Sequence, residues 1–225
     1  FVLTLRCNQN CIYCQASSKK QNCTEYSMSK ETMLSAVKLM FESKSHDLTM
    51  EFQGGEPSLE YDLIKLGIEE AERYNKVEKR NITYVLCTNC IELSEELLNL
   101  CNQYNVQIST SLDGPEYIHN KNRGRIDSYN NVIRGIEKAR AYVGHNNVNA
   151  LMTASTFGVE YPTEIVDEYI KLGFRSIFLR ALNPYGLASE NEDWDCYNSK
   201  FIDFYKTALS YIIELNINGV FFVEE

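Results

Sequence analysis

Segments with strand-like and helix-like patterns alternate along the whole chain of 225 residues. Apolar residues recur every three or four positions in the helix-like segments, and short runs rich in β-branched residues lie between them. Strands are expected at 2–6, 48–53, 82–89, 106–112, 148–156 and 176–182, and helices at 29–44, 61–74, 94–104, 127–142, 162–173 and 196–216. Regular alternation of this kind predicts an α/β fold with a parallel sheet covered by helices.

The length of the chain selects among the parallel folds. A closed eight-unit barrel takes about 250 residues, whereas this chain has 225 residues and six strand–helix units. We therefore expect an open, partial (β/α)6 TIM-like barrel, formed as a single domain over residues 1–225. In such sheets the functional loops follow the C-terminal ends of the strands, and most unusual motifs of this sequence fall there.

Charge and hydropathy exclude two classes of partner. The formal net charge is −9 and the pI is near 5.0, so the chain lacks the basic stripe of a nucleic-acid-binding protein. Its apolar runs are far shorter than the ~20 residues that span a bilayer, so no membrane partner is expected. Because the chain starts at Phe1 and stops at "FFVEE", we expect it to be part of a longer protein.

Eight cysteines are present, and Cys7, Cys11 and Cys14 share one short segment with C-x3-C-x2-C spacing. This spacing favours metal ligation over disulfides, and therefore a reducing, cytoplasmic location. Thiolates bind zinc and iron–sulfur clusters, but a structural zinc site needs four ligands, and no histidine lies within the first 45 residues. Three thiolates suit a four-iron cluster with one open iron. A non-enzymatic zinc- or cluster-binding module is the alternative.

The cysteine motif, with Tyr13 before its third cysteine, resembles the signature of the radical S-adenosylmethionine (radical SAM) superfamily. The "GGEP" sequence at 54–57 is similar to the second signature of that family. The resemblance implies an anaerobic oxidoreductase with two cofactors, a 4Fe-4S cluster and S-adenosyl-L-methionine. In that family the open iron chelates S-adenosylmethionine, one electron cleaves the sulfonium, and the resulting 5′-deoxyadenosyl radical takes hydrogen from the substrate.

Further motifs narrow the resemblance. "TNC" at 88–90 and "SLDGPEYIHNKNR" at 111–123 resemble the peptide-modifying branch that includes anaerobic sulfatase maturases and SPASM proteins. "LRALNPYG" at 179–186 is most similar to the maturase of the His-Xaa-Ser peptide system. The resemblance implies a peptide or protein substrate, a reducing partner such as flavodoxin or ferredoxin, and a cysteine-rich C-terminal extension outside this chain. A radical enzyme acting on a small metabolite is the alternative.

The resemblance also implies a set of cofactor-binding residues beside the three cluster cysteines. Glycines let a backbone approach a ligand closely, a glutamate can accept from the methionyl amine or brace the loop, and an arginine can pair with a carboxylate. The alternatives are that Ser111 only closes a turn and that Arg123 is a solvated charge. The set is Tyr13, Gly54, Gly55, Glu56, Pro57, Asn89, Ser111 and Arg123. No residue is assigned as a catalytic acid or base.

Several other residues receive structural interpretations. Cys90 stands where relatives often have glycine, and Cys87 and Cys90 form a second C-x2-C pair. Cys87 is expected to be buried in a strand, and one such pair is weak support for a second metal site. All three histidines are expected on the surface, and the aromatic residues of the last helix in the core. These residues are His46, His119, His145, Phe201, Phe204, Tyr205 and Tyr211.

Overall fold

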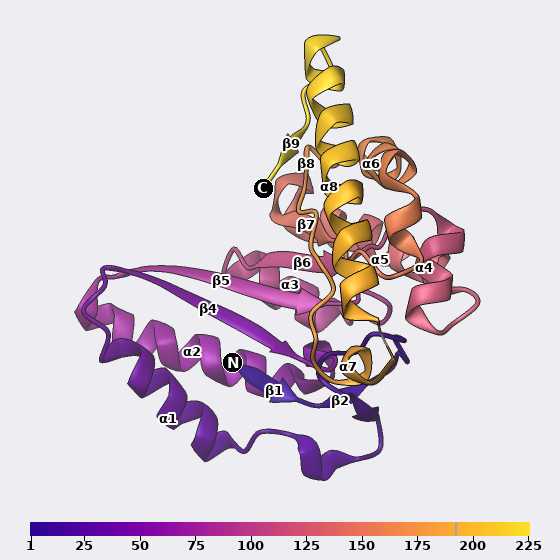
Figure 1. The fold of residues 1–225 in the computed structure, drawn as a ribbon. Coiled ribbons are helices and arrows are strands. Elements are labelled where there is room, and N and C mark those ends of the chain that lie inside the picture. The colour runs from indigo at the N-terminus through magenta and orange to yellow at the C-terminus, as the bar shows by residue number, and fades with distance from the viewer. Residues whose placement is uncertain (192) are drawn as a thin grey trace. The chain divides into compact units, whose positions relative to one another are not determined.

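The computed structural model describes residues 1–191 and 193–225 (Figure 1). Its helices are α1 Lys30–Phe41, α2 Tyr61–Glu78, α3 Glu95–Gln103, α4 Glu116–Arg123, α5 Ser128–Val143, α6 Pro162–Lys171, α7 Leu187–Asn191 and α8 Trp194–Ile217. Its strands are β1 Val2–Thr4, β2 Arg6–Cys7, β3 Lys19–Lys20, β4 Asp47–Gly54, β5 Asn81–Thr88, β6 Gln107–Ser111, β7 Val148–Leu151, β8 Ser176–Ile177 and β9 Val223–Glu224.

Five strands form the main sheet, in the order β1-β4-β5-β6-β7. The pairs β1–β4, β4–β5 and β5–β6 are parallel, which confirms the predicted α/β class. The sixth predicted strand, at 176–182, is much shorter than expected. Its first two residues form β8, which pairs with β9 in a separate sheet, and Ala181 makes one isolated parallel bridge to Ala154.

The chain divides into two compact units, which we describe separately. Unit 1 comprises residues 1–8, 16–110 and 134–149, and unit 2 comprises residues 9–15, 111–133 and 150–225. The prediction of a single domain over residues 1–225 stays a prediction. Among the described residues, no helix combines the length and the apolar character needed to cross a bilayer.

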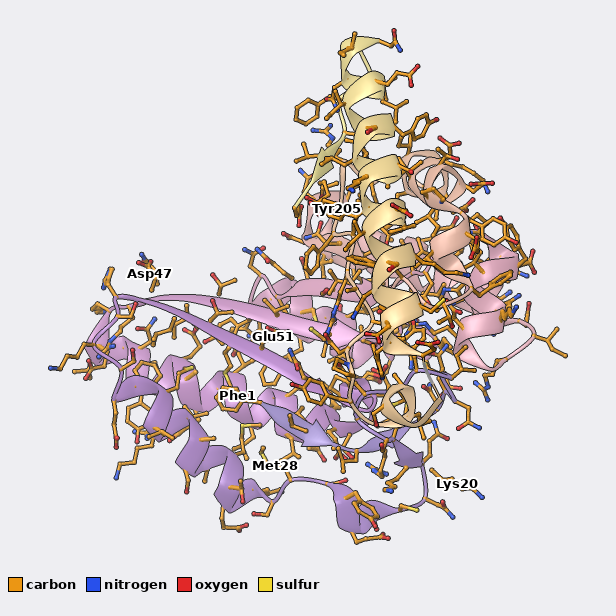
Figure 2. The ribbon with its side chains drawn as sticks, viewed as in Figure 1. Phe1, Lys20, Met28, Asp47, Glu51 and Tyr205 are labelled. Carbon is orange, nitrogen blue, oxygen red and sulfur yellow. The ribbon has the colours of Figure 1, made fainter. Side chains whose placement is uncertain are left out.

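The core of unit 1 lies between the sheet and two helices. Met50 and Phe52 of β4 are fully buried, and both lie against Gly67 of α2, where an added Cβ would come within 2.8 Å of the Met50 side chain. In Figure 1, α1 and α2 run along one side of β4 and β5. Because side chains alternate along a strand, Glu51 of β4 points to the opposite face; Figure 2 labels it part-way along the strand.

Local sequence signals set the helix ends. The Ser29 hydroxyl accepts from the Thr32 amide at the start of α1, and the Ser94 hydroxyl accepts from the Leu97 amide at the start of α3. Serine is one of the residue types favoured at the N-cap, so the start of each helix follows from its local sequence. Pro162 opens α6, and Gly173 follows its end with φ of 77°, the left-handed conformation that glycine adopts without strain.

Unit 2 contains a helix that the sequence patterns did not predict. Residues 116–123 form α4, which ends at Gly124 with φ of 69°. This helix carries His119, which is 1% exposed, so the prediction of a surface histidine there was wrong, whereas His46 and His145 are exposed as expected. In α8, Phe204 is buried, but Phe201, Tyr205 and Tyr211 keep part of their surface exposed. Tyr205 is labelled on α8 in Figure 2.

Candidate functional site

Residues 9–15 of unit 2 follow Cys7 and form a loop that contains Cys11 and Cys14; we call it the cysteine loop. The Cys14 amide donates to the Cys11 carbonyl at 3.2 Å, so the two cysteines lie on one turn. Cys7, Cys11 and Cys14 are all partly exposed, and none of the eight cysteines, all within the described residues, forms a disulfide. Among the described residues, no three Cys, His, Asp or Glu side chains are placed to hold a single metal ion.

The last turn of α4 holds one side of the cysteine loop. The carbonyl of Asn122 accepts from the Ile12 amide at 2.9 Å. Gly124 lies so close to the loop that an added Cβ would be 2.3 Å from the Asn10 carbonyl oxygen. A side chain at position 124 would therefore collide with backbone, in addition to the strain of its positive φ.

Segment 183–186, the "NPYG" sequence, holds the same loop from another side. The Leu187 amide donates to the Cys14 carbonyl at 3.1 Å, and the Asn183 amide group donates to Gln15 Oε1 at 3.0 Å. An added Cβ at Gly186 would be 2.4 Å from the Cys14 carbonyl oxygen. The sequence patterns marked this segment without a role, and the structure places it against the cysteine loop.

A buried ion pair lies behind Cys11. Arg123 donates to Asp113 through Nε at 3.0 Å and through Nη2 at 2.6 Å, and its Nη1 lies 3.7 Å from the Cys11 sulfur. Tyr13 donates to Asp113 at 2.5 Å, and its ring lies 5.3 Å from the guanidinium. Burial by itself would raise the pKa of Asp113, but the Arg123 charge and hydrogen bonds outweigh it and lower that pKa. Burial raises the pKa of the Cys11 thiol, and Arg123 opposes this effect.

A network of buried hydrogen bonds connects the cysteine loop with His119. Gln9 donates to the Ser128 hydroxyl at 2.6 Å, and His119 Nε2 lies 3.1 Å from the same oxygen. The Asp113 amide donates to His119 Nδ1 at 3.3 Å, which assigns the ring proton to Nε2. Burial lowers the pKa of His119 to about 4, so the ring is neutral at pH 7. His119 therefore supports the loop by hydrogen bonding rather than by charge.

In unit 1, the "GGEP" sequence joins the ends of neighbouring strands. The Gly55 amide donates to the Thr4 carbonyl at 2.8 Å, and the Glu56 amide donates to the Arg6 carbonyl at 2.7 Å. An added Cβ at Gly54 or Gly55 would be 2.1 or 2.3 Å from these two carbonyl oxygens. Close packing of the strands therefore requires both glycines, whether or not a ligand binds there.

Glu56 is 1% exposed and braces the end of β5. It accepts from the Thr88 hydroxyl at 2.6 Å, the Asn89 amide at 2.7 Å and the Ser58 amide at 3.0 Å. Burial is the largest influence and raises the pKa of Glu56, although these donors oppose it. Pro57 follows as the first residue of a short 3-10 helix, Pro57–Glu60.

Two asparagines lie beside this brace. The Asn89 side chain donates to Asn8 Oδ1 at 2.6 Å and accepts from the Ile91 amide at 3.0 Å. The Asn8 Nδ2 atom is buried and has no hydrogen-bond partner among the described residues. A buried N–H group without a partner is rare, so this atom is suited to donate to a bound ligand.

The comparison with protein families decides which class of protein this chain belongs to. The model of the radical SAM superfamily matches residues 1–168, which include the cysteine motif, "GGEP" and α4. The chain belongs to the radical SAM superfamily. Membership indicates an enzyme, and the cofactors of the family are a 4Fe-4S cluster and S-adenosylmethionine, as the sequence predicted.

Two curated relatives resemble the chain over most of its length. A cysteine-type anaerobic sulfatase-maturating enzyme of Clostridium perfringens is 24% identical over 220 residues, which are 95% of this chain and 59% of that protein. The radical SAM cyclopropyl synthase TigE of Paramaledivibacter caminithermalis is 26% identical over 222 residues, 92% of this chain and 46% of that protein.

Solved structures support the fold. Native anSMEcpe with bound AdoMet has a TM-score of 0.81 and 21% identity, covering 98% of this chain and 61% of that chain. Streptococcus suis SuiB bound to precursor peptide SuiA has a TM-score of 0.70 and 15% identity, covering all of this chain and 47% of that one. These similarities confirm the partial TIM-like barrel. The chain spans only about half to three fifths of the length of the proteins that it matches.

The residues of this radical SAM chain fit the cluster of the family. The three thiols of the motif would each bind a different iron, so they need not converge on one point as the ligands of a single ion do. Arg123 supplies a cation and an N–H donor at the Cys11 sulfur, which suits an anionic thiolate ligand. Ser111, the last residue of β6, is partly exposed. Arg123 is 7% exposed, so its interpretation as a solvated charge was wrong.

The second cysteine pair has a structural explanation. Cys90 adopts φ of 57°, in the left-handed region that favours glycine. It is fully buried, and burial raises its pKa to about 12. Cys87 is only half-buried, contrary to the prediction, because it lies on the sheet face of Glu51 and donates to that carboxylate at 2.9 Å.

Proposed function

We propose that this chain is the catalytic core of a radical SAM enzyme that modifies a peptide or protein. Support comes from the family match over residues 1–168, which contains all three motif cysteines and "GGEP". The residues proposed to hold the 4Fe-4S cluster are Cys7, Cys11 and Cys14. When bound, the cluster and S-adenosylmethionine supply one-electron chemistry that generates a radical able to remove hydrogen from carbon.

Residues of unit 1 are proposed to bind the methionyl end of S-adenosylmethionine. Backbone groups of residues 54–57 remain candidates because they lie at the C-terminal end of β4, where ligands bind in parallel sheets. Asn8 offers a buried N–H donor, and its neighbour Asn89 is held by Glu56. Glu56 itself uses both oxygens within the protein, so its proposed role is to position Asn89.

Three residues of unit 2 are also proposed to bind S-adenosylmethionine. Tyr13 lies in the cysteine loop, and Ser111 and Arg123 match positions that commonly contact the carboxylate of S-adenosylmethionine in the family. Nε and one N–H of Nη2 donate to Asp113, which leaves N–H groups of Nη1 and Nη2 available to such a ligand.

A peptide or protein substrate is the class that the relatives favour. The sulfatase-maturating enzymes act on a protein by name, and three of the structural neighbours are bound to peptides. A peptide-modifying enzyme of this family needs an external one-electron donor, for which we propose flavodoxin or ferredoxin. We further propose a cytoplasmic location without nucleic-acid or membrane partners; the net charge of −9 agrees with the absence of nucleic acid.

Anaerobic reconstitution tests this function. The wild-type chain is expected to take up four iron and four sulfide and to form 5′-deoxyadenosine from S-adenosylmethionine with a strong reductant. Replacing Cys7, Cys11 and Cys14 together with alanine should abolish both, while the matched controls Cys23→Ala and Cys101→Ala should retain both. Bound zinc without sulfide in the wild-type chain would support the non-enzymatic module instead.

A small metabolite is the second candidate substrate. The observation that favours it is a probable GTP 3′,8-cyclase of Methanopyrus kandleri, 28% identical over 186 residues. Mass spectrometry of candidate peptides incubated with the reconstituted full-length protein separates the two. A peptide mass change that requires S-adenosylmethionine supports the peptide assignment, whereas consumption of a nucleotide alone supports the metabolite.

A further inference from the structure

The buried pair Arg123–Asp113 faces Cys11 with its positive side. The carboxylate binds the edge of the guanidinium formed by Nε and Nη2, at 3.0 and 2.6 Å. The remaining nitrogen, Nη1, lies 3.7 Å from the Cys11 sulfur. The guanidinium is therefore the charged group that contacts the sulfur, and the carboxylate fixes its orientation from the other edge.

The surroundings strengthen this electrostatic contact. Asp113 is 0% exposed and Arg123 is 7% exposed, so water screens their charges weakly. Tyr13 closes the site, since its hydroxyl donates to Asp113 and its ring lies beside the guanidinium. Asn122 donates to the same carboxylate at 3.1 Å. A charge fixed in this way acts on Cys11 with constant geometry.

The cysteine loop is equally well held. Asn122 and Gly124, the two neighbours of Arg123 in sequence, contact Ile12 and Asn10, the two neighbours of Cys11. Three consecutive residues of α4 and its C-cap thus match three consecutive residues of the loop. This register keeps Nη1 at the sulfur, so Arg123 is a positioning residue whose effect is on Cys11.

We propose that the Arg123–Asp113 pair sets the reduction potential of the cluster: Arg123 raises it through its charge and its N–H donor at the Cys11 sulfur, and Asp113 moderates that effect. The inference rests on the proposed function, because it takes Cys11 as a cluster ligand. Hydrogen bonds to cluster sulfurs and the nearby net charge are general determinants of such potentials. An added electron makes the cluster more negative, and a fixed cation stabilises that reduced state.

The test is an EPR-monitored redox titration of the reconstituted chain without S-adenosylmethionine. Arg123→Gln removes the cation and leaves Asp113 charged, so the equilibrium constant for reduction should fall about tenfold, ~59 mV for one electron. Asp113→Asn leaves the cation uncompensated, so the potential should rise. The double variant should lie between the two single variants. Arg73→Gln, which removes an exposed arginine of α2, is the matched control and should not shift the potential.

Opposite shifts from the two single variants are the decisive result, because a purely structural disturbance would not reverse sign with the charge removed. Arg123→Lys keeps the positive charge and should remain within threefold of the wild-type constant. If Arg123→Gln fails to load a cluster, the rise expected for Asp113→Asn decides the question. Unchanged potentials in both charge-removing variants, shifts of one sign, or an Arg123→Lys shift as large as that of Arg123→Gln would overturn the inference. A wild-type chain that takes up no iron or sulfide would instead reject the proposed function.

Discussion

Each of the two units buries a carboxylate shortly after a strand of the main sheet, and the two carboxylates are stabilised differently. Glu56 follows β4 in unit 1 and accepts only from uncharged donors, namely two backbone amides and the Thr88 hydroxyl. Asp113 follows β6 in unit 2 and binds the Arg123 guanidinium, with Tyr13 as a further donor. Burial raises the pKa of Glu56, whereas Arg123 overcomes burial and lowers the pKa of Asp113.

The different donors suit Glu56 and Asp113 to different roles. Neutral donors leave the charge of Glu56 in place but connect two backbone segments, residues 56–58 and residues 88–89, which suits a brace between strand ends. A full ion pair cancels most of its own charge and leaves the guanidinium edge free to act on Cys11. The two carboxylates should also respond oppositely to pH: the stability from Glu56 is lost as pH rises through its raised pKa, and that from Asp113 is lost as pH falls through its lowered pKa.

The largest loss of unfolding free energy is expected from breaking the ion pair between Arg123 and Asp113. Asp113→Ala leaves the Arg123 charge buried without a partner and removes the acceptor of Tyr13 and Asn122. Loss of one partner of a buried pair destabilises by about 3–5 kcal/mol. Urea unfolding at pH 7 measures the change. A loss below about 1 kcal/mol would show that solvent reaches the guanidinium and would remove the contrast with Glu56.

The second-largest change in stability is expected from protonation of His119, the neutral histidine beside Asp113. His119 has an ordinary pKa of 6.5 when unfolded and one of about 4 in the folded chain. The contribution of neutral His119 to the unfolding free energy is therefore present above pH 6.5 and is lost as the pH falls toward 4. The loss amounts to about 3 kcal/mol. Unfolding free energies measured between pH 7 and 4 should fall more steeply for the wild-type chain than for His119→Gln.

The exposed His46 supplies the mutational control. His46→Gln should leave the unfolding free energy at pH 7 within about 0.5 kcal/mol of the wild-type value, because its side chain lies on the surface. If His119→Gln and the wild-type chain lose stability in parallel, His119 is not buried in neutral form, and the hydrogen bond from the Asp113 amide would need another explanation.

A smaller effect is expected at Glu56. In Glu56→Gln an NH2 group replaces one oxygen and faces a backbone or hydroxyl donor, which leaves buried donors unsatisfied at about 1–3 kcal/mol. The deficit should be larger at pH 5 than at pH 8, since the wild-type carboxyl is least favourable when ionised. Urea unfolding at both pH values tests this, with the exposed Glu69→Gln of α2 as a control expected within 0.5 kcal/mol. Stabilisation by Glu56→Gln would mean that charge burial outweighs the three hydrogen bonds.

Sequence patterns predicted best the features that depend on neighbours along the chain. Ser29 and Ser94 cap helices by contacts three residues away, and the alternating apolar residues of β4 fix its buried face. The three motif cysteines lie within one short segment of the sequence, and "GGEP" lies within another, so the family could be inferred from these two motifs. The positions of these cofactor-binding residues about a bound cofactor stay predictions.

Long-range contacts explain what the patterns missed. Helix α4 has few apolar residues in "EYIHNKNR", and it is held by polar contacts of its last turn with the cysteine loop, more than 100 residues earlier. Asp113 lies within the motif at residues 111–123, but its role is evident only from its hydrogen bonds to Arg123 and Tyr13 in the folded chain. The sixth predicted strand failed because only two of its residues find a ladder partner, in β9 at the far end of the sequence.

The smallest expected effect comes from an ion pair of similar length on the surface of unit 2. Lys200 and Glu160 approach to 2.7 Å, but their side chains are 49% and 54% exposed. Water and salt screen such a pair, so Lys200→Ala should change the unfolding free energy far less than Asp113→Ala does, and less still at 1 M salt. The same urea titration used for Asp113→Ala provides the comparison. Because the Arg123–Asp113 contact is 2.6 Å long, the two pairs differ in burial rather than in distance. Equal losses from Lys200→Ala and Asp113→Ala would mean that burial does not set the strength of the pair at Cys11.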